Sequence, residues 1–509
     1  MKSRWSWAVG ALVASVIAIT AVGAAVSGDA EPALAGTLEP VAELARRDAD
    51  IAFFRARAAE DPWGAADRSR LAQLYLQRGR EGGGLDDFRR AERAAREALT
   101  LRAGRNTGAR LTLASSLLAQ HRFAEARTAA EALVAEAPDR ASYQALLGEI
   151  QMELGDYGAA AATFGALEAE RGNLAVAPRL ARWEEVRGNP VRARAILYAA
   201  RDQAAARIDL PREQVAWFHL RVADLELRTG RLGAADEALR AGLAVEPNDP
   251  RLWAARARLA ALRHRWREVA RIGARLGDGA DLATLALVGD AWAQLGRAGE
   301  AERWYARLEA KNAARPEPFA RQWTQFRVDH GRHLPETLAL LRREAGERRD
   351  VLGCDLLAWA LHRAGDDAAA REAMRQALRM GTRDATLHFH AGMIERALGD
   401  RAAARAHLRR ALGLNPRFHP TFPDTARAAL RELEHSAPRP LSGRLSVGAA
   451  AEALLVTGGR PPAGVRGRRR RAAGGIVDGG RDTRGKSSYH PGERPQALDG
   501  GRPAGGTGP

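Results

Sequence analysis

The stretch Ala397–Pro416, ALGDRAAARAHLRRALGLNP, contains a pattern that recurs along the chain and decides the fold. Gly399 opens a short turn, Ala404 follows it by five residues, and the bulky Leu408 comes four residues later. Glycine tolerates the left-handed backbone found where helices end, and a proline such as Pro416 stops a helix because it has no amide donor. The stretch therefore predicts a tight turn followed by a helix that ends at its proline.

The same pattern returns at intervals close to 34 residues, which indicates an internal repeat. The residues that open the later turns are His121, Gly155, Gly188, Gly230, His264, Gly296, Gly331, Gly365 and Gly399. An earlier turn at Gly79 is lengthened by the insert EGGG. About ten units are therefore predicted between Asp67 and Glu434.

Small residues stand seven positions before most of these turns and five positions after them. The first column contains Ala114, Gly148, Ala223, Ala257, Gly289, Ala358 and Gly392. Helix axes approach most closely where side chains are small, so the columns predict the crossing point of an antiparallel helix pair. Bulky residues such as Phe164 and Leu408, four positions beyond the second column, are expected to fill the gap toward the next unit.

The units resemble the tetratricopeptide repeat, and the chain looks like an exported bacterial protein of that type. The resemblance is carried by YQALLGEIQMELGDYGAAAATFGALEAE from Tyr143 and LHFHAGMIERALGDRAAARAHLRRALGLNP from Leu387. It implies an all-α fold in which helix–turn–helix units stack into an α-solenoid, a right-handed superhelix. Two units fit the pattern less well. In Leu174–Gln203 the spacing is too long, and in Pro316–Arg349 we expect Pro335 to interrupt the second helix.

The chain divides into four regions by composition. Residues 1–35 form a signal peptide or a membrane anchor, 36–66 a capping helix, 67–434 the repeat array, and 435–509 a tail rich in Gly, Pro and Arg. The tail is predicted to be disordered, because it has too few apolar residues to offset the entropy of ordering. A frameshift in the gene is the alternative explanation of its composition.

The first region begins with two basic residues, Lys2 and Arg4, followed by an uncharged apolar run from Trp5 to Val26. About 20 apolar residues suffice to cross a bilayer. The segment is therefore either a signal peptide cleaved after Ala33-Leu34-Ala35 or an anchor retained in the inner membrane. Both interpretations place the rest of the protein in the periplasm or another extracytoplasmic space.

The net charge of +17 does not by itself indicate nucleic acid, since only 3 of the 79 basic residues are lysine. So strong a preference for Arg is typical of a GC-rich genome, and we expect no nucleic acid partner. The single cysteine, Cys354, lies in an apolar helical stretch and excludes an internal disulfide.

The sequence indicates no enzyme, cofactor or metal. Gly480–Ser487 satisfies the phosphate-loop pattern G-x-x-x-x-G-K-S, but no buried strand leads into it and Pro491 follows closely. The histidine pairs His388/His390 and His330/His333 have no further ligand at metal-binding spacing. We expect no catalytic residues and no small-molecule substrate.

The remaining candidates for function are groove-facing side chains on the first helices. They are Asp224, Arg228, Arg258, Asp290, Trp359, His362, Met393 and Arg396. Chaperone-binding members of the resembled family use Asn and Lys/Arg in such columns, and this chain does not match them there. We therefore expect a protein or peptide partner in the groove of a scaffold or adaptor of the cell envelope. The alternative is a regulatory or assembly subunit of a membrane-associated enzyme complex.

Overall fold

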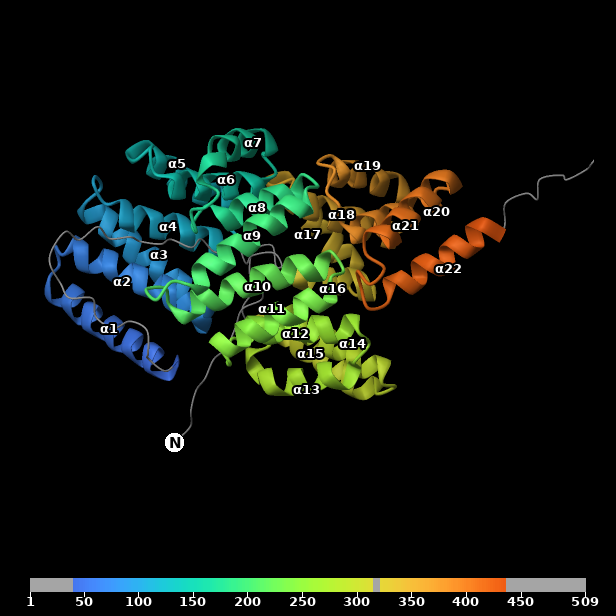
Figure 1. Ribbon diagram of the computed structural model, residues 1–509, viewed down its shortest axis with the longest axis horizontal. Coiled ribbons are helices and arrows are strands. Elements are labelled where there is room, and N and C mark those ends of the chain that lie inside the picture. Colours follow the sequence, from blue (N-terminus) through green and yellow to red (C-terminus); the bar gives the residue numbers. More distant parts are fainter. Residues whose placement is uncertain (1–39, 315–320, 436–509) are drawn as a thin grey trace, which may run out of the picture. The chain divides into compact units, whose positions relative to one another are not determined.

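The computed structural model describes residues 40–314 and 321–435, and these residues form α-helices joined by short turns, without a β-strand (Figure 1). Ten helix pairs follow one another. Each has a first and a second helix, as predicted from the repeat. The predicted signal or anchor segment and the Gly/Pro/Arg-rich tail lie outside the described residues. In the described part of the chain, none of the helices combines the length and the apolar character needed to cross a bilayer.

The first five pairs are α2 (Ala65–Arg78) with α3 (Gly84–Leu101), α4 (Thr107–Ala119) with α5 (Phe123–Glu136), α6 (Ala141–Leu154) with α7 (Tyr157–Ala166), α8 (Ala177–Val186) with α9 (Pro190–Ala205), and α10 (Arg212–Arg228) with α11 (Leu232–Val245). The next five are α12 (Pro250–Leu262) with α13 (Trp266–Leu276), α14 (Leu282–Gln294) with α15 (Ala298–Ala314), α16 (Arg321–His330) with α17 (Leu334–Glu347), α18 (Val351–Arg363) with α19 (Asp367–Leu378), and α20 (Ala385–Ala397) with α21 (Arg401–Leu414). Helix α1 (Pro40–Glu60) precedes the pairs and α22 (Phe422–His435) follows them.

The predicted turn residues from His121 to Gly399 adopt the expected left-handed backbone, whereas Gly79 has a right-handed one. Gly155 and Gly399 have φ of 78° and 79°, and the two histidines that replace glycine, His121 and His264, also have positive φ at 59° and 56°. At Gly79 the insert forms a short π-helical turn, Gly79–Gly83. The turn positions were therefore predictable even where glycine is absent.

The small first column lies against the bulky residue of the same unit. A Cβ added at Gly148, Gly289 or Gly392 would come within 3.0 Å of Phe164, Tyr305 or Leu408, respectively. The bulky residues also reach the next unit, since the Phe164 ring stacks on Trp183 of α8 at 5.8 Å. One side chain thus closes its own helix pair and joins it to the following pair.

The two units that fit the repeat less well are regular pairs. The long spacing after Gly188 is taken up by the 16 residues of α9, a link, and the 17 residues of α10. The expectation that Pro335 interrupts its helix is wrong. Pro335 lies in the first turn of α17, where its missing amide and fixed φ suit a helix start.

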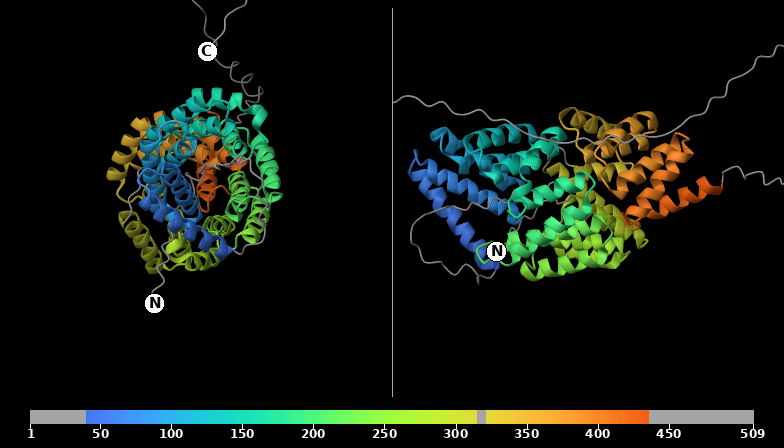
Figure 2. Two further views of the ribbon diagram at one scale, coloured as in Figure 1. Left: turned by 90° about the vertical axis from the view of Figure 1, so that its left-hand side faces the viewer. Right: turned by 45° about the horizontal axis from the view of Figure 1, so that its top comes forward.

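The pairs wind into a right-handed superhelix, as the resemblance implied (Figure 2). First helices of neighbouring units contact one another, for example α10 with α12 and α18 with α20, which places them on the inner side of the curve. The second helices form the outer side.

Successive turns of the superhelix touch. The amide of Arg349 donates to the carbonyl of Leu154 at 3.0 Å, and the amide of Val351 donates to the Tyr157 hydroxyl at 2.7 Å. Further along, Asn415 Nδ2 donates to the carbonyl of Arg228 at 3.0 Å. These partners are 187 to 195 residues apart in sequence, so one turn takes between five and six units.

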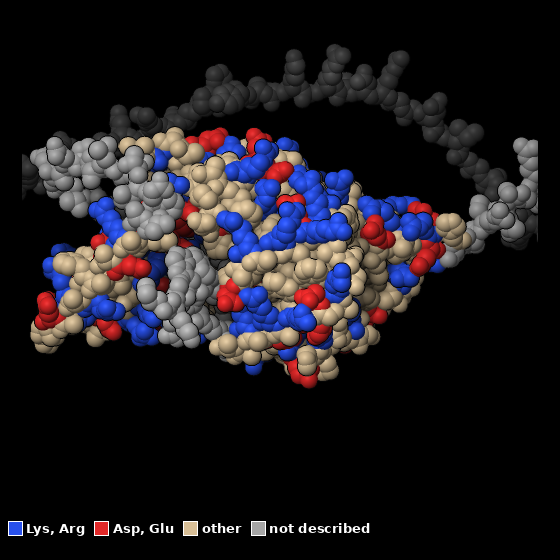
Figure 3. Space-filling model, turned by 90° about the horizontal axis from the view of Figure 1, so that it is seen from below, with Lys and Arg blue, Asp and Glu red and all other residues tan. Residues whose placement is uncertain are grey.

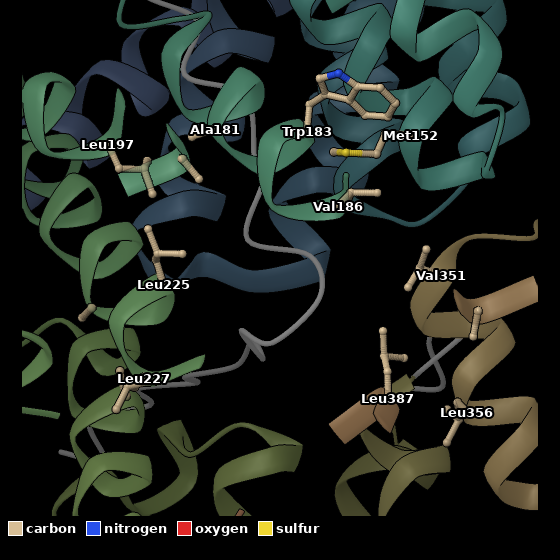
Figure 4. Close-up of a cluster of buried hydrophobic side chains, with 14 of the residues drawn as sticks. Met152, Ala181, Trp183, Val186, Leu197, Leu225, Leu227, Val351, Leu356 and Leu387 are labelled. Carbon is tan, nitrogen blue, oxygen red and sulfur yellow. The ribbon is translucent and has the colours of Figure 1, made fainter. Parts of the chain in front are cut away.

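A shared apolar core joins the two turns. Met152, Val186 and Leu227 from one turn belong to the same buried cluster as Val351 and Leu387 from the next (Figure 4). The turn glycines at this contact have no room for a side chain. A Cβ at Gly188 would lie 2.4 Å from the carbonyl oxygen of Gly381, whereas one at Gly399 would meet nothing within 4 Å.

Gly188→Ala and Gly399→Ala provide a matched test of this contact, since both glycines have a φ of 79°. The backbone strain alone should lower the stability of Gly399→Ala by roughly 1 kcal/mol. Gly188→Ala should lose roughly 2 kcal/mol more, because its methyl group collides with the next turn. Thermal unfolding followed by circular dichroism measures both. Equal losses would mean that the turns do not touch at Gly188.

Candidate partner-binding surface

The predicted groove residues lie on first helices and therefore on the inner side of the superhelix. Asp224 and Arg228 belong to α10, Arg258 to α12, Asp290 to α14, Trp359 and His362 to α18, and Met393 and Arg396 to α20. Five of them, Asp224, Arg228, Arg258, Asp290 and Trp359, belong to a polar ladder, which is a series of side-chain bonds that join neighbouring first helices from α6 to α12 and from α14 to α20. Their role in binding a partner stays a prediction.

In the first half of the ladder the bonds are ion pairs. Arg258 binds Asp224 at 2.5 Å, and Arg228 Nε lies 3.1 Å from Glu185 of α8. Asp224 is buried, and burial raises the pKa of its carboxyl, but Arg258, Arg221 and Arg228 outweigh burial and hold that pKa below its usual range. A buried carboxylate whose pKa is lowered by nearby arginines keeps its negative charge. The Arg258–Asp224 pair is therefore a permanent ion pair of the structure.

The innermost pair was missed by the sequence analysis. Arg179 Nε of α8 lies 2.6 Å from Glu149 Oε2 of α6, and both side chains are almost fully buried. Glu149 directly follows the small column residue Gly148, just as Asp224 follows Ala223. That position was a usable signal for Glu149, but its partner Arg179 lies in the unit with irregular spacing.

In the second half of the ladder, histidine and tryptophan replace arginine. Asp290 accepts from the Tyr305 hydroxyl at 2.7 Å and lies 3.1 Å from His330 Nε2 of α16. Asp329 of α16 accepts from Trp359 Nε1 at 2.9 Å, and Asp355 of α18 lies 2.9 Å from His390 Nδ1 of α20. These bonds link α14, α16, α18 and α20 in order.

Trp359 is itself a packing residue, with only 5% of its surface exposed. Its ring stacks on His390 at 4.3 Å and on His362 at 5.1 Å. His362 Nδ1 also lies 2.5 Å from Asp367. Of the two predicted residues Trp359 and His362, His362 is therefore the more accessible to a partner.

Arg396 is the most exposed of the predicted residues. Arg396 binds Glu432 of α22 at 2.5 Å and remains 39% exposed, and Met393 is half-buried against the main core. Together with Arg228, Arg258, Asp290 and His362, they give the inner side a mixed set of charged and apolar groups. Such a set suits hydrogen bonding and ion pairing with a polypeptide more than it suits one small ligand.

The histidine pairs considered as metal ligands are engaged elsewhere. His388 Nδ1 lies 3.0 Å from His407 Nδ1, and His330 is bound to Asp290. Across residues 40–314 and 321–435, no three ligand-type side chains gather at one point as a metal site requires. Cys354 is buried, and burial raises the pKa of its thiol.

The outer surface carries many arginines interspersed with carboxylates, as the face in Figure 3 shows. Arginines of the array pair with carboxylates, for example Arg263 with Asp236 at 2.9 Å and Arg332 with Glu302 at 2.6 Å. The charge on this face is therefore divided between both signs.

A buried charge cluster lies where the turns of the superhelix meet. Arg321 contacts Asp350 at 2.8 Å and Glu344 at 3.2 Å, and Arg348 contacts Glu344 at 2.9 Å and Glu153 of the neighbouring turn at 3.7 Å. Three carboxyl groups thus share two guanidinium groups. Burial, with the negative charge of Asp350, raises the pKa of Glu153 to about 7, although Arg321 and Arg182 oppose this. Burial raises the pKa of Glu344 to about 7 as well, against the opposing charge of Arg321.

The fold and its inner side define an α-solenoid of helix pairs with a bonded inner ladder. Residues 111–175 and 356–417, which span α4 to α7 and α18 to α21, match the sequence model of a tetratricopeptide repeat family. No curated protein matches the chain significantly.

Solved structures that match this chain include the APC/C hetero-tetramer Cut9–Hcn1, at 12% identity over 77% of this chain and 94% of that chain, with a TM-score of 0.31. Yeast Tom70 is 11% identical over 77% of this chain and 94% of its own, with a TM-score of 0.33. Naa15/Naa10 bound to HypK-THB is 17% identical over 77% of this chain and 65% of that chain, with a TM-score of 0.24.

The charge cluster predicts that stability depends on pH. A carboxyl whose pKa is raised in the folded state stabilises that state fully below its unfolded pKa, and this contribution is lost as pH rises through the folded pKa. We therefore expect the melting temperature to fall between pH 6 and 8. Glu153→Gln should flatten this fall and stabilise the array at pH 8 by on the order of 1–3 kcal/mol. Glu237→Gln, at an exposed position on α11, is the control. An unchanged pH profile in Glu153→Gln would contradict the assignment.

Proposed function

We propose that this protein is a non-enzymatic scaffold or adaptor of the cell envelope, which binds a segment of a protein partner along the inner side of its superhelix. Tetratricopeptide arrays are in general non-catalytic scaffolds for protein–protein interaction, and a solenoid presents an extended inner surface for that purpose. The observation that supports the proposal best is the ladder. The first helices α12, α14, α18 and α20 carry Arg258, Asp290, His362, Met393 and Arg396, with their side chains partly open.

The ladder makes this surface preorganised. Bonds join neighbouring first helices from α6 to α12 and from α14 to α20, so the spacing of the open side chains within each of these stretches is set before a partner arrives. Binding to a preorganised surface loses less conformational entropy than binding to a mobile one. A partner segment is expected to run along the helices and to present carboxylates to Arg396 and cationic or amide groups to Asp290.

The placement in the envelope rests on the sequence alone. Lys2 and Arg4 followed by the apolar run Trp5–Val26 support export. A second candidate function, an assembly subunit of a membrane-associated enzyme complex, uses the same surface and the same location. It differs only in the nature of the partner.

The binding surface is tested by reversing the charge of one exposed arginine on the inner side of the superhelix and of one on the outer side. Arg396→Glu should reduce recovery of the cross-linked partner at least tenfold, because it places a like charge beside the expected carboxylates. Arg240→Glu, at an exposed outer position of α11, should leave recovery unchanged. Quantitative mass spectrometry after cross-linking in the native cells measures both. Equal recovery with Arg396→Glu would exclude binding at this end of the ladder.

Export is tested with a reporter that is active only outside the cytoplasm, fused after residue 438. The full N-terminal region should give an active reporter, and replacing Val13 and Ile17 with arginine should abolish activity, because charges in the apolar run prevent insertion. An active reporter in the arginine variant would exclude this segment as the export signal.

A further inference from the structure

Helix α1 occupies the place of a second helix whose first helix is missing. In the array, second helices pack against the first helix of the next unit, as α5 does against α6. Helix α1 packs against α2 in the same way. The second helices α3 to α21 each pack against the first helix of their own unit as well. In the described part of the chain no such helix precedes α1, so one of its faces remains uncovered.

The uncovered face of α1 is apolar. The exposed apolar residues of α1 recur at intervals of four and three and form one stripe, Ala45, Ala49, Ala52, Ala56 and Ala59, with Phe53 beside them; Trp63, in the turn that follows α1, is exposed as well. Phe53 is 56% exposed and Trp63 is 82% exposed. The opposite end of the array differs, because α22 turns polar side chains such as Arg427, Arg431 and Glu434 outward. Solenoid ends that face water carry a polar outer surface, so the α1 end is the one built for contact.

The charges beside the stripe are arranged for pairing with an antiparallel copy of the same helix. Arg46 and Glu60 lie on the flank that carries Phe53, seven residues before it and seven after it. On the other flank, Asp48 and Arg55 lie four residues before Ala52 and three after it. A two-fold axis near Ala52 and Phe53 therefore brings each charge opposite one of the other sign.

These charges are largely available for such contacts. Within the described residues, Arg46, Arg55 and Glu60 make no ion pair. Asp48 binds Arg78 at 2.9 Å but keeps 63% of its side chain exposed. The alternation of signs disfavours an anionic lipid surface, which selects a uniformly basic polar face.

We propose that α1 is a self-association site, at which α1 of a second copy packs antiparallel across the Ala52–Phe53 region. In this arrangement Arg46 meets the partner's Glu60, Asp48 meets the partner's Arg55, and the alanine stripes allow a close approach of the two axes. The 21 residues of α1 span about 30 Å. One helix face of this length buries less than the roughly 800 Å² per partner of a standard interface, so the dimer is reversible.

A cysteine at the axis tests the site in the full chain. The single native cysteine, Cys354, is buried. Ala52→Cys therefore adds a thiol at an exposed position, and oxidation will act on this thiol rather than on Cys354. In mild detergent, Ala52→Cys should form a disulfide-linked homodimer on oxidation. Ala274→Cys, at an exposed position on α13, should stay monomeric. Equal cross-linking of both variants would overturn the proposal.

Charge reversal in the Ala52→Cys background tests the antiparallel register. Arg46→Glu or Glu60→Arg alone should lower cross-linking at least fivefold, and the two together should restore it, because each contact then has its signs exchanged. Failure of the double variant to restore cross-linking would overturn the arrangement.

Two other occupants of the face give different results. If residues 1–39 of the same chain cover it, the thiol of Ala52→Cys will be unreactive toward maleimide at every protein concentration. If a membrane covers it, the thiol will be protected only when vesicles containing phosphatidylglycerol are added. Either result would overturn the proposal, and both leave the inner-side partner test unaffected.

Discussion

The contact between a small residue of the first helix and a bulky residue of the second is the interaction on which the array depends. At Gly148, Gly289 and Gly392 even one methyl group would collide with the opposing ring or leucine. Because the bulky residue also touches the following pair, each unit is completed only by its neighbours. Stability in such an array is a property of the stack rather than of any single unit.

Upon this packing the chain adds a polar ladder whose chemistry changes along its length. Between α6 and α12 the bonds are arginine–carboxylate pairs, and between α14 and α20 they involve histidine or tryptophan. Buried ion pairs contribute little net stability but are costly to break singly. The ladder therefore fixes the relative orientation of first helices more than it stabilises them, and this orientation spaces the open side chains of the inner surface.

Local features of the fold were predictable, because each is encoded within one unit. The left-handed turns were found even at His121 and His264, which lack the freedom of glycine. Pro335 was misread because a proline that breaks a helix and one that begins a helix look alike unless the helix start is known. The inner position of Asp224 and Arg258 also followed from the repeat, but their mutual pairing did not. Recognising a pair across 34 residues requires the angle between adjacent units.

Long-range features could not be predicted from the repeat. Gly188 and Gly399 occupy equivalent positions and have the same φ, yet only Gly188 lies against another turn. Nothing in either unit distinguishes them, since the contact depends on how curvature accumulates over more than 180 residues. The same holds for Glu153, whose pKa is raised by burial and by the negative charge of Asp350 at the N-cap of α18, a residue of the next turn.

The hydrogen bonds between successive turns have a mechanical consequence. An open solenoid behaves as an elastic coil, whose pitch can lengthen or shorten as small rotations add up between units. Here backbone groups at Leu154 and Arg228 are tied to residues one full turn later, so stretching this part of the coil requires breaking those bonds. Between α6 and the end of α21 the protein is therefore a stiff spacer, and its pitch is fixed by these bonds between successive turns.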